Sequence, residues 1–190
     1  YFKIGLSGII GGCGLGIAMI TFIWSITNTS AAITLLCLAA MPFLTALLGF
    51  LFLRETISYN VWIAIIVAAI GILIMGLGNT SKSSLLGLVF GLASAVGFSV
   101  FSVSLRWRKE TPKFTTVAIA GLFCAIVSSV ILFNGEVSFI SSSYNEGLFA
   151  LHGTIVCLGL ILYSIGSKAI PAAELTLLSL TEIIGGIFWV

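Results

Sequence analysis

The stretch FIWSITNTSAAITLLCLAAMPF, Phe22–Phe43, lies in a segment, Gly12–Leu48, that recurs along the chain. The second copy runs from Gly153 onward, through LYSIGSKAIPAAELTLLSLTEI, Leu162–Ile183. Aligning the alanine pairs that begin at Ala31 and Ala172 separates the two copies by 172 − 31 = 141 residues. Five apolar runs fit inside that offset, so the second copy should cross a bilayer in the opposite sense to the first. Inverted repeats of this kind are the construction of alternating-access transporters. The repeat therefore predicts two halves related by a two-fold axis in the membrane plane.

The composition indicates a membrane protein. Hydrophobic residues make up 59% of the chain and charged residues 7%, whereas soluble domains carry about a quarter charged residues. Crossing the hydrocarbon core takes about 20 mostly apolar residues. Seven runs approach that length: Ile4–Ile26, Ala31–Leu53, Val61–Leu77, Leu85–Leu105, Thr115–Phe133, Gly147–Ile165 and Ala172–Val190. We predict an all-α polytopic membrane protein with seven transmembrane helices in two inverted-topology repeats.

The basic residues divide unevenly between the two sides of the predicted membrane. One side carries only Lys82, and the other carries Lys3, Arg54, Arg106, Arg108, Lys109, Lys113 and Lys168. Because cytoplasmic loops carry the excess of Lys and Arg, the segment before the first run should be cytoplasmic. The basic stretch 106–113 is then a topology determinant at the lipid headgroups, and we expect no nucleic-acid partner.

Small residues divide the chain and predict how its helices pack. Gly8, Gly12 and Gly16 recur at intervals of four, which places them in one stripe where a neighbouring backbone can approach closely. The polar connector NTSKSSL lies between the repeats. We therefore assign residues 1–78 to the first repeat, 79–84 to a linker and 85–190 to the second repeat.

Three segments carry a family resemblance. The segment TNTSAAITLLCLAAMPFLTALLGFLFLRETIS, Thr27–Ser58, has paired small residues, a mid-helix proline at Pro42 and a glutamate after the span. It resembles the EamA family of the drug/metabolite transporter superfamily, as do WIAIIVAAIG, Trp62–Gly71, and KAIPAAELTLLSLTE, Lys168–Glu182. The family often has Glu-Pro where this chain has Glu182 followed by isoleucine, so the resemblance does not extend to a proline kink there.

The resemblance implies ten helices in two five-helix repeats, of which this chain would cover helices three to nine. Both repeats are then expected to be incomplete, the first at its N-terminal end and the second at its C-terminal end. It also implies a permease in the cell membrane, the inner membrane in a bacterium, that moves a small organic metabolite. Many members are exporters, so export is the expected direction.

Glu182 is the first candidate for a functional side chain. It lies ten residues into the run that begins at Ala172, which at about 1.5 Å per residue puts it close to the bilayer midplane. An ionisable group at that depth usually faces a cavity. Its repeat mate is Met41, beside Pro42, since 182 − 41 = 141. Glu182 would bind a substrate amine or couple transport to protons; the alternative is a neutral glutamic acid bonded to a neighbouring helix.

Further candidates are aromatic residues and the proline. Trp24 and Tyr163 lie near opposite mouths of the predicted pathway, where they would contact substrate or serve only in an aromatic belt. Pro42 would break its helix and serve as a gating point. We interpret His152 as a hydrogen-bonded structural histidine, with a proton relay as the alternative.

The sequence offers little support for two alternative functions, an intramembrane enzyme and a seven-helix receptor. An intramembrane enzyme needs clustered catalytic groups, yet the chain has one histidine and no aspartate. A seven-helix receptor with a retinal Schiff base needs a lysine in mid-membrane, and every lysine is at the end of a run. We expect no catalytic residue, metal site or cofactor, with a small-molecule substrate and the lipid bilayer as partners. The oligomeric state stays open, a homodimer included.

Overall fold

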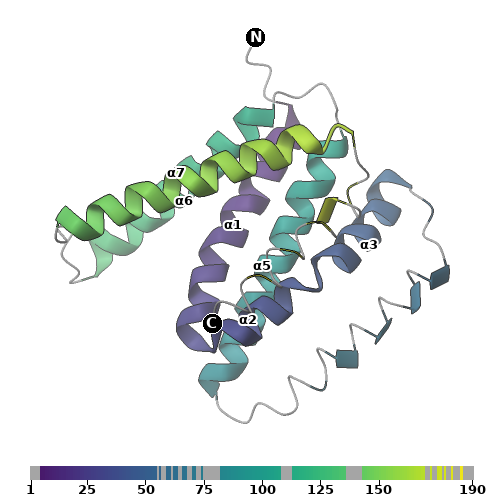
Figure 1. Ribbon diagram of the computed structural model, residues 1–190, viewed down its shortest axis with the longest axis horizontal. Helices are drawn as coiled ribbons and strands as arrows, with labels where there is room; N and C mark the ends of the chain where they lie inside the picture. Colours follow the sequence, from purple (N-terminus) through teal and green to yellow (C-terminus); the bar gives the residue numbers. More distant parts are fainter. Residues whose placement is uncertain are drawn as a thin grey trace.

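The computed structural model describes residues 5–54, 56, 59–60, 62–63, 66–67, 70–71, 74, 82–107, 113–135, 143–169, 172, 175–176, 178, 181 and 185. The helices with defined bounds are α1 (Leu6–Asn28), α2 (Ala31–Leu38), α3 (Met41–Leu53), α5 (Lys82–Trp107), α6 (Lys113–Asn134) and α7 (Ser143–Gly166). Figure 1 shows α1 and α5 side by side at the centre, with α2 and α3 against α5, and α6 and α7 extending to one side.

Five of the seven predicted runs are helical segments long and apolar enough to cross a membrane: α1, α2 together with α3, α5, α6 and α7. The part of the chain that the structure describes is all-helical. The runs predicted at 61–77 and 172–190 lie largely outside the described residues, and the second of these runs is the later part of the second repeat copy. The prediction of seven helices in two inverted repeats therefore stays a prediction.

The run Ala31–Leu53 is two helices and not the single helix that its hydropathy predicts. The chain turns at Ala39 and Ala40, and Pro42 lies in the first turn of α3. Proline has no backbone N–H, so the Leu38 carbonyl loses the donor that an uninterrupted helix would supply from four residues ahead. The helix break therefore lies at Pro42, where the sequence predicted one.

The backbones of α1 and α5 come into contact where the two helices cross, at Gly14 and Gly97. A Cβ atom on Gly97 would lie 2.6 Å from the carbonyl oxygen of Gly14 and 3.0 Å from the backbone nitrogen of Ala18. A Cβ on Gly14 would lie 3.0 Å from the carbonyl oxygen of Gly97. The two backbones touch, so a side chain at Gly97 would collide with the backbone of α1, and one at Gly14 would be tightly packed against α5.

The predicted glycine stripe of α1 packs against α6. A Cβ on Gly12 would lie 2.6 Å from Cγ2 of Ile119, and one on Gly16 would lie 2.5 Å from Cδ1 of Phe123. Apolar side chains of α6 therefore fill the space that side chains on these glycines would need. Glycines on α1 thus allow both α5 and α6 to pack closely against it.

Hydroxyl groups connect the helices where glycine brings them together. Ser25 Oγ donates to the carbonyl oxygen of Gly87 at 2.7 Å and lies 2.8 Å from Thr34 Oγ1, which connects α1, α2 and α5. Gly91 lies beside the same junction, where a Cβ would be 3.0 Å from Cβ of Cys37. These side chains satisfy one another inside the protein, as groups that lack water must.

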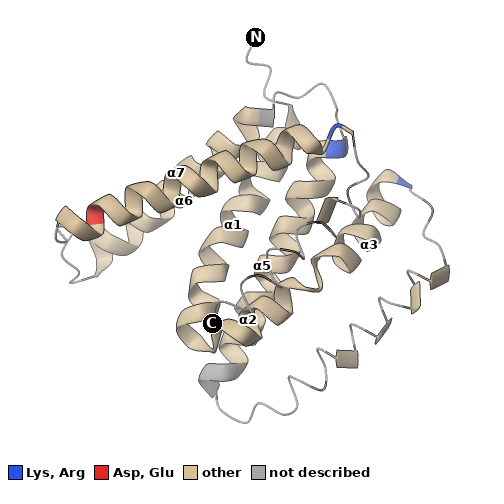
Figure 2. Ribbon diagram, viewed as in Figure 1, with Lys and Arg blue, Asp and Glu red and all other residues tan. Residues whose placement is uncertain are grey.

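Described charged residues lie at helix ends. Arg106 lies in the last turn of α5, Arg54 caps the end of α3, and Glu146 lies in the first turn of α7. Figure 2 shows the basic residues at the end of the molecule where α3, α5 and α7 end, and the glutamate at the opposite end of α7.

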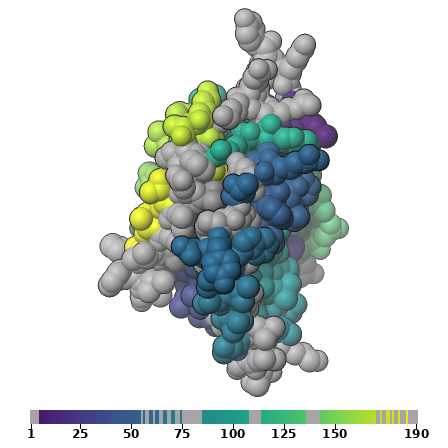
Figure 3. Space-filling model, turned by 90° about the vertical axis from the view of Figure 1, so that its right-hand side faces the viewer, coloured from purple at the N-terminus to yellow at the C-terminus, as the bar shows by residue number. Residues whose placement is uncertain are grey.

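The exposed large side chains of α3 are apolar. Figure 3 shows α3 on one side of the molecule, with described residues between 59 and 74 beneath it. Leu51 and Phe52 of α3 are 60% and 72% exposed, which suits contact with lipid chains.

We predict that Gly97→Ala lowers the thermal stability of the protein. Alanine is normally the better helix residue by about 0.8–1.0 kcal/mol, but here its methyl group would meet backbone atoms that cannot rotate away, and overpacking costs about 1–3 kcal/mol. The matched control is Gly121→Ala on α6, where an added Cβ has nothing within 4 Å. Thermal unfolding of purified protein should separate the two variants, and equal melting temperatures would show that the crossing is not tight.

Candidate functional site

A cavity of about 650 Å³ lies among helices from both sides of the predicted linker. Its walls come from α1, α2 and the start of α3 on one side and from α5, α6 and α7 on the other. Sites for small organic molecules have volumes of about 300–1,000 Å³ and are mostly apolar with a few polar groups. The size and the lining of this cavity match that description.

One face of each flanking helix lines the cavity. On α7 the lining residues recur at helical spacing: His152, Val156, Gly159, Leu160 and Tyr163. On α6 they follow the same rule: Cys124, Val127, Ser128 and Ile131. Because residues three and four apart share a helix face, each helix presents one continuous stripe to the cavity.

The stripes of α1 and α7 correspond in register. Four residues of the α7 stripe lie 141 positions after residues of α1 that line the same cavity, for instance 163 − 22 = 141. The four pairs are Leu15 with Val156, Ala18 with Gly159, Met19 with Leu160, and Phe22 with Tyr163. The offset comes from the sequence repeat alone, so the cavity is lined by residues of α1 and α7 that the predicted repeat pairs.

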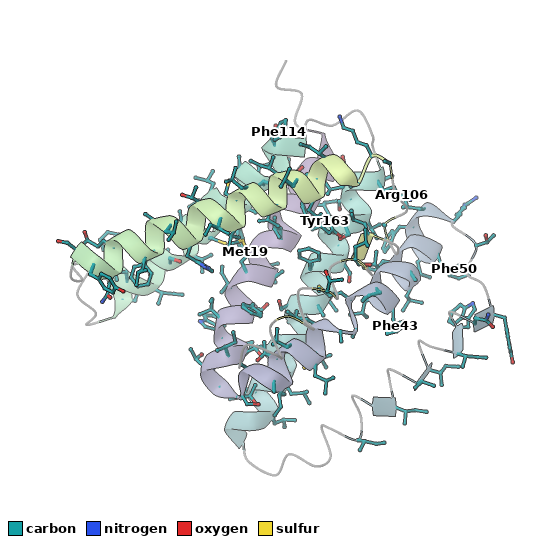
Figure 4. All side chains as sticks on the ribbon, in the orientation of Figure 1. Met19, Phe43, Phe50, Arg106, Phe114 and Tyr163 are labelled. Carbon is teal, nitrogen blue, oxygen red and sulfur yellow. The ribbon has the colours of Figure 1, made fainter. Side chains whose placement is uncertain are left out.

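Tyr163 lines the cavity and packs against aromatic residues of α5. Its ring packs against Phe98 and Phe101 of α5, with centroid distances of 5.2 Å and 5.9 Å. Its hydroxyl oxygen lies 2.7 Å from Ser102 Oγ, so the polar end of the side chain is engaged within the protein. Figure 4 shows Tyr163 in the space between α7, α1 and α5, on the side where Met19 lies. The ring, and not the hydroxyl, is what Tyr163 offers to a ligand.

Trp24, which the sequence placed near a mouth of the predicted pathway, lines the same cavity. Its ring meets Phe90 of α5 edge-on at 5.3 Å between centroids. Pro42 is buried and does not line the cavity, but its neighbour Met41 does. Met41 also accepts a hydrogen bond at its carbonyl oxygen from Ser99 Oγ, at 3.2 Å, which ties the broken helix to α5.

His152 has different surroundings from those that the sequence suggested. We interpreted it as a hydrogen-bonded structural histidine, yet its side chain is exposed and lines the cavity. In the described part of the chain no hydrogen bond is made by either ring nitrogen. The shared α7 stripe with Tyr163 is the sequence signal that would have found it, because the two residues are eleven apart, three helical turns.

Glu182, the first candidate from the sequence, lies outside the described residues. Its repeat mate Met41 is on the cavity wall. The expectation that Glu182 faces a cavity therefore rests on the repeat and stays a prediction.

Comparison with known proteins gives one match. Residues 2–77 match the model of the EamA-like transporter family. No curated protein and no solved structure matches. The matched segment includes α1, α2 and α3, which form one wall of the cavity.

We predict that Gly159→Phe closes part of the cavity without unfolding the protein. An added Cβ at Gly159 has nothing within 4 Å, so the phenyl ring would extend into the open space that this residue lines. Gly153→Phe is the matched control, because Gly153 lies on the same helix with equally open surroundings and does not line the cavity.

Binding of the apolar fluorescent probe N-phenyl-1-naphthylamine to protein in lipid nanodiscs checks this prediction. Gly159→Phe should weaken binding severalfold at an unchanged melting temperature, whereas Gly153→Phe should bind like the wild type. Equal binding by both variants would mean that the cavity does not take up small apolar molecules.

Proposed function

We propose that the cavity is the substrate site of a multi-pass membrane transporter, because residues 2–77 match the model of the EamA-like transporter family. The transporter moves a small organic metabolite by alternating access, with an amino acid or a related compound as the first candidate and export as the direction. The observation that carries this proposal is the set of four residue pairs, 141 positions apart, that line one cavity.

The paired stripes support alternating access for a geometric reason. Transporters with inverted repeats bind substrate at the interface between the repeats, near the bilayer midplane. A site lined by residues of α1 and α7 that the predicted repeat pairs agrees with that position, because each half would then close over it in turn. The break between α2 and α3 adds a second feature of such sites, a discontinuous helix beside the cavity.

Glu182 completes the proposed site by the same symmetry. Met41 lines the cavity beside the helix break, and Glu182 is its counterpart 141 residues later. A carboxylate at that place would bind a substrate amine or carry a proton, with the cost of its membrane burial offset by facing the cavity.

The basic residues support one orientation. We propose that the ends of α3, α5 and α7, which carry Arg54, Arg106 and Lys168, are cytoplasmic. The connection between α6 and α7 then faces outward.

The transport proposal is tested with the full-length protein in liposomes and a panel of radiolabelled small metabolites. Movement of at least one compound above empty liposomes is expected, with a saturable rate. If no compound moves while the protein is folded in the bilayer, the transporter assignment is lost.

We predict that Glu182→Gln strongly reduces transport while expression and melting temperature stay near those of the wild type. Glutamine keeps the size and the hydrogen-bonding capacity of the side chain but removes the charge. Glu174→Gln is the control, because Glu174 would lie in the first turn of the same predicted span, where a carboxylate stabilises the helix dipole. Wild-type transport by Glu182→Gln would reduce the residue to a packing role.

We predict the orientation of the chain with single cysteines at Lys109 and Ser142, introduced after the four native cysteines have been replaced. In intact cells a membrane-impermeant maleimide should label position 142 and not position 109, since only the α6–α7 connection faces outward. The reverse labelling pattern would invert the topology.

A further inference from the structure

The polar side chains that line the cavity fall into two groups. Ser94 Oγ donates to the carbonyl oxygen of Ala18 at 2.8 Å, and the Tyr163 hydroxyl is paired with Ser102. The side chains of Trp24, Ser128 and His152 make no hydrogen bond within the part of the chain that the structure describes. Polar groups in a membrane are normally satisfied inside the protein, so the second group is available to a ligand.

The three available groups lie toward the same end of the cavity. Trp24 is in the last turns of α1, Ser128 is in the second half of α6, and His152 is in the first half of α7. Those parts of the helices belong to the side that we propose faces outward. Tyr163 lies about 16 Å farther along α7, at 1.5 Å per residue. Between these ends the cavity wall is apolar, with Met19, Leu160 and their neighbours.

His152 is also the one α7 lining residue without an equivalent in α1. The position 141 residues earlier is Gly11, where a Cβ would lie 2.9 Å from Cβ of Ser104. Gly11 is therefore closed in a helix seam, whereas His152 opens on the cavity. A residue contributed by one repeat alone can distinguish one end of a substrate from the other.

We propose that Trp24, Ser128 and His152 bind the hydrogen-bond-accepting head group of an amphipathic substrate, such as a carboxylate, whose apolar body occupies the middle of the cavity. This inference rests on the proposed transport function and adds a substrate class to it. The indole N–H, the hydroxyl and the imidazole N–H are all donors, and donors act strongly on an anionic acceptor in a water-poor site.

The charges of the described cavity wall agree with this assignment. Among the described lining residues there is no Asp, Glu, Lys or Arg. The head group is therefore held by hydrogen bonds and not by an ion pair with these residues. The contact is separate from the one proposed for Glu182, which recognises positive charge.

Binding of tritiated 4-phenylbutyrate to the full-length protein in lipid nanodiscs tests the inference. This probe has a carboxylate at one end of an apolar body. His152→Leu, which keeps the bulk and removes both ring nitrogens, should weaken binding at least about tenfold, because a hydrogen bond to a charged group is lost. His152→Gln, which keeps a donor, should restore much of the affinity.

Two further variants complete the test. Ser128→Ala removes an exposed hydroxyl and should weaken binding a few-fold even if His152→Leu does not fold. Thr154→Val is the control on the same helix, because Thr154 Oγ1 donates to the carbonyl oxygen of Ala150 and does not line the cavity. It should bind the probe like the wild type.

The inference is overturned if His152→Leu and Ser128→Ala bind the probe as tightly as the wild type, or if the wild type does not bind it. Failure of the proposed function is a different result, in which the wild type moves no compound of the metabolite panel in liposomes.

Discussion

The contact between the backbones of Gly14 and Gly97 is the constraint on which the rest of this structure depends. Helices in a bilayer gain little by hiding apolar surface from one another, since lipid is equally apolar, and they associate through close packing and hydrogen bonds. Here the carbonyl oxygen of Gly14 occupies the space where a side chain of Gly97 would begin. That approach also brings Ser94 of α5 within 2.8 Å of the Ala18 carbonyl oxygen.

The cavity follows from this central pair. With α1 and α5 in backbone contact, the remaining face of α1 is free to form walls with α6 and α7. Gly12 and Gly16 hold α6 close, while α7 contacts the α1–α5 core through Leu160 and Tyr163 of its stripe. The space between remains open because its lining residues on α7 include Gly159, which fills little volume. Tight packing on one side of α1 thus leaves room for a ligand on the other.

Much of the fold could be predicted from hydropathy, and the details of packing could not. The runs that became α1, α5, α6 and α7 are recognisable because crossing a bilayer demands length and apolarity. Pro42 indicated the helix break before Met41, whereas hydropathy alone predicted a single membrane span over Ala31–Leu53. Gly14 escaped the predicted stripe because a spacing of four identifies one helix face, whereas α1 uses two faces. The prediction of a hydrogen-bonded His152 was wrong because a single polar residue does not show which face of its helix lines a cavity. Tyr163, three helical turns later on the same face, was the signal that could have identified that face.

The central claim is that the transported compound occupies the cavity between α1 and α7. A cryo-electron microscopy structure of the full-length protein in nanodiscs, with a compound that it transports, tests this most directly. The account predicts ligand density between Trp24 and Tyr163, in contact with Met19 and Leu160. Ligand density elsewhere in the protein, with this cavity closed by side chains, would contradict it.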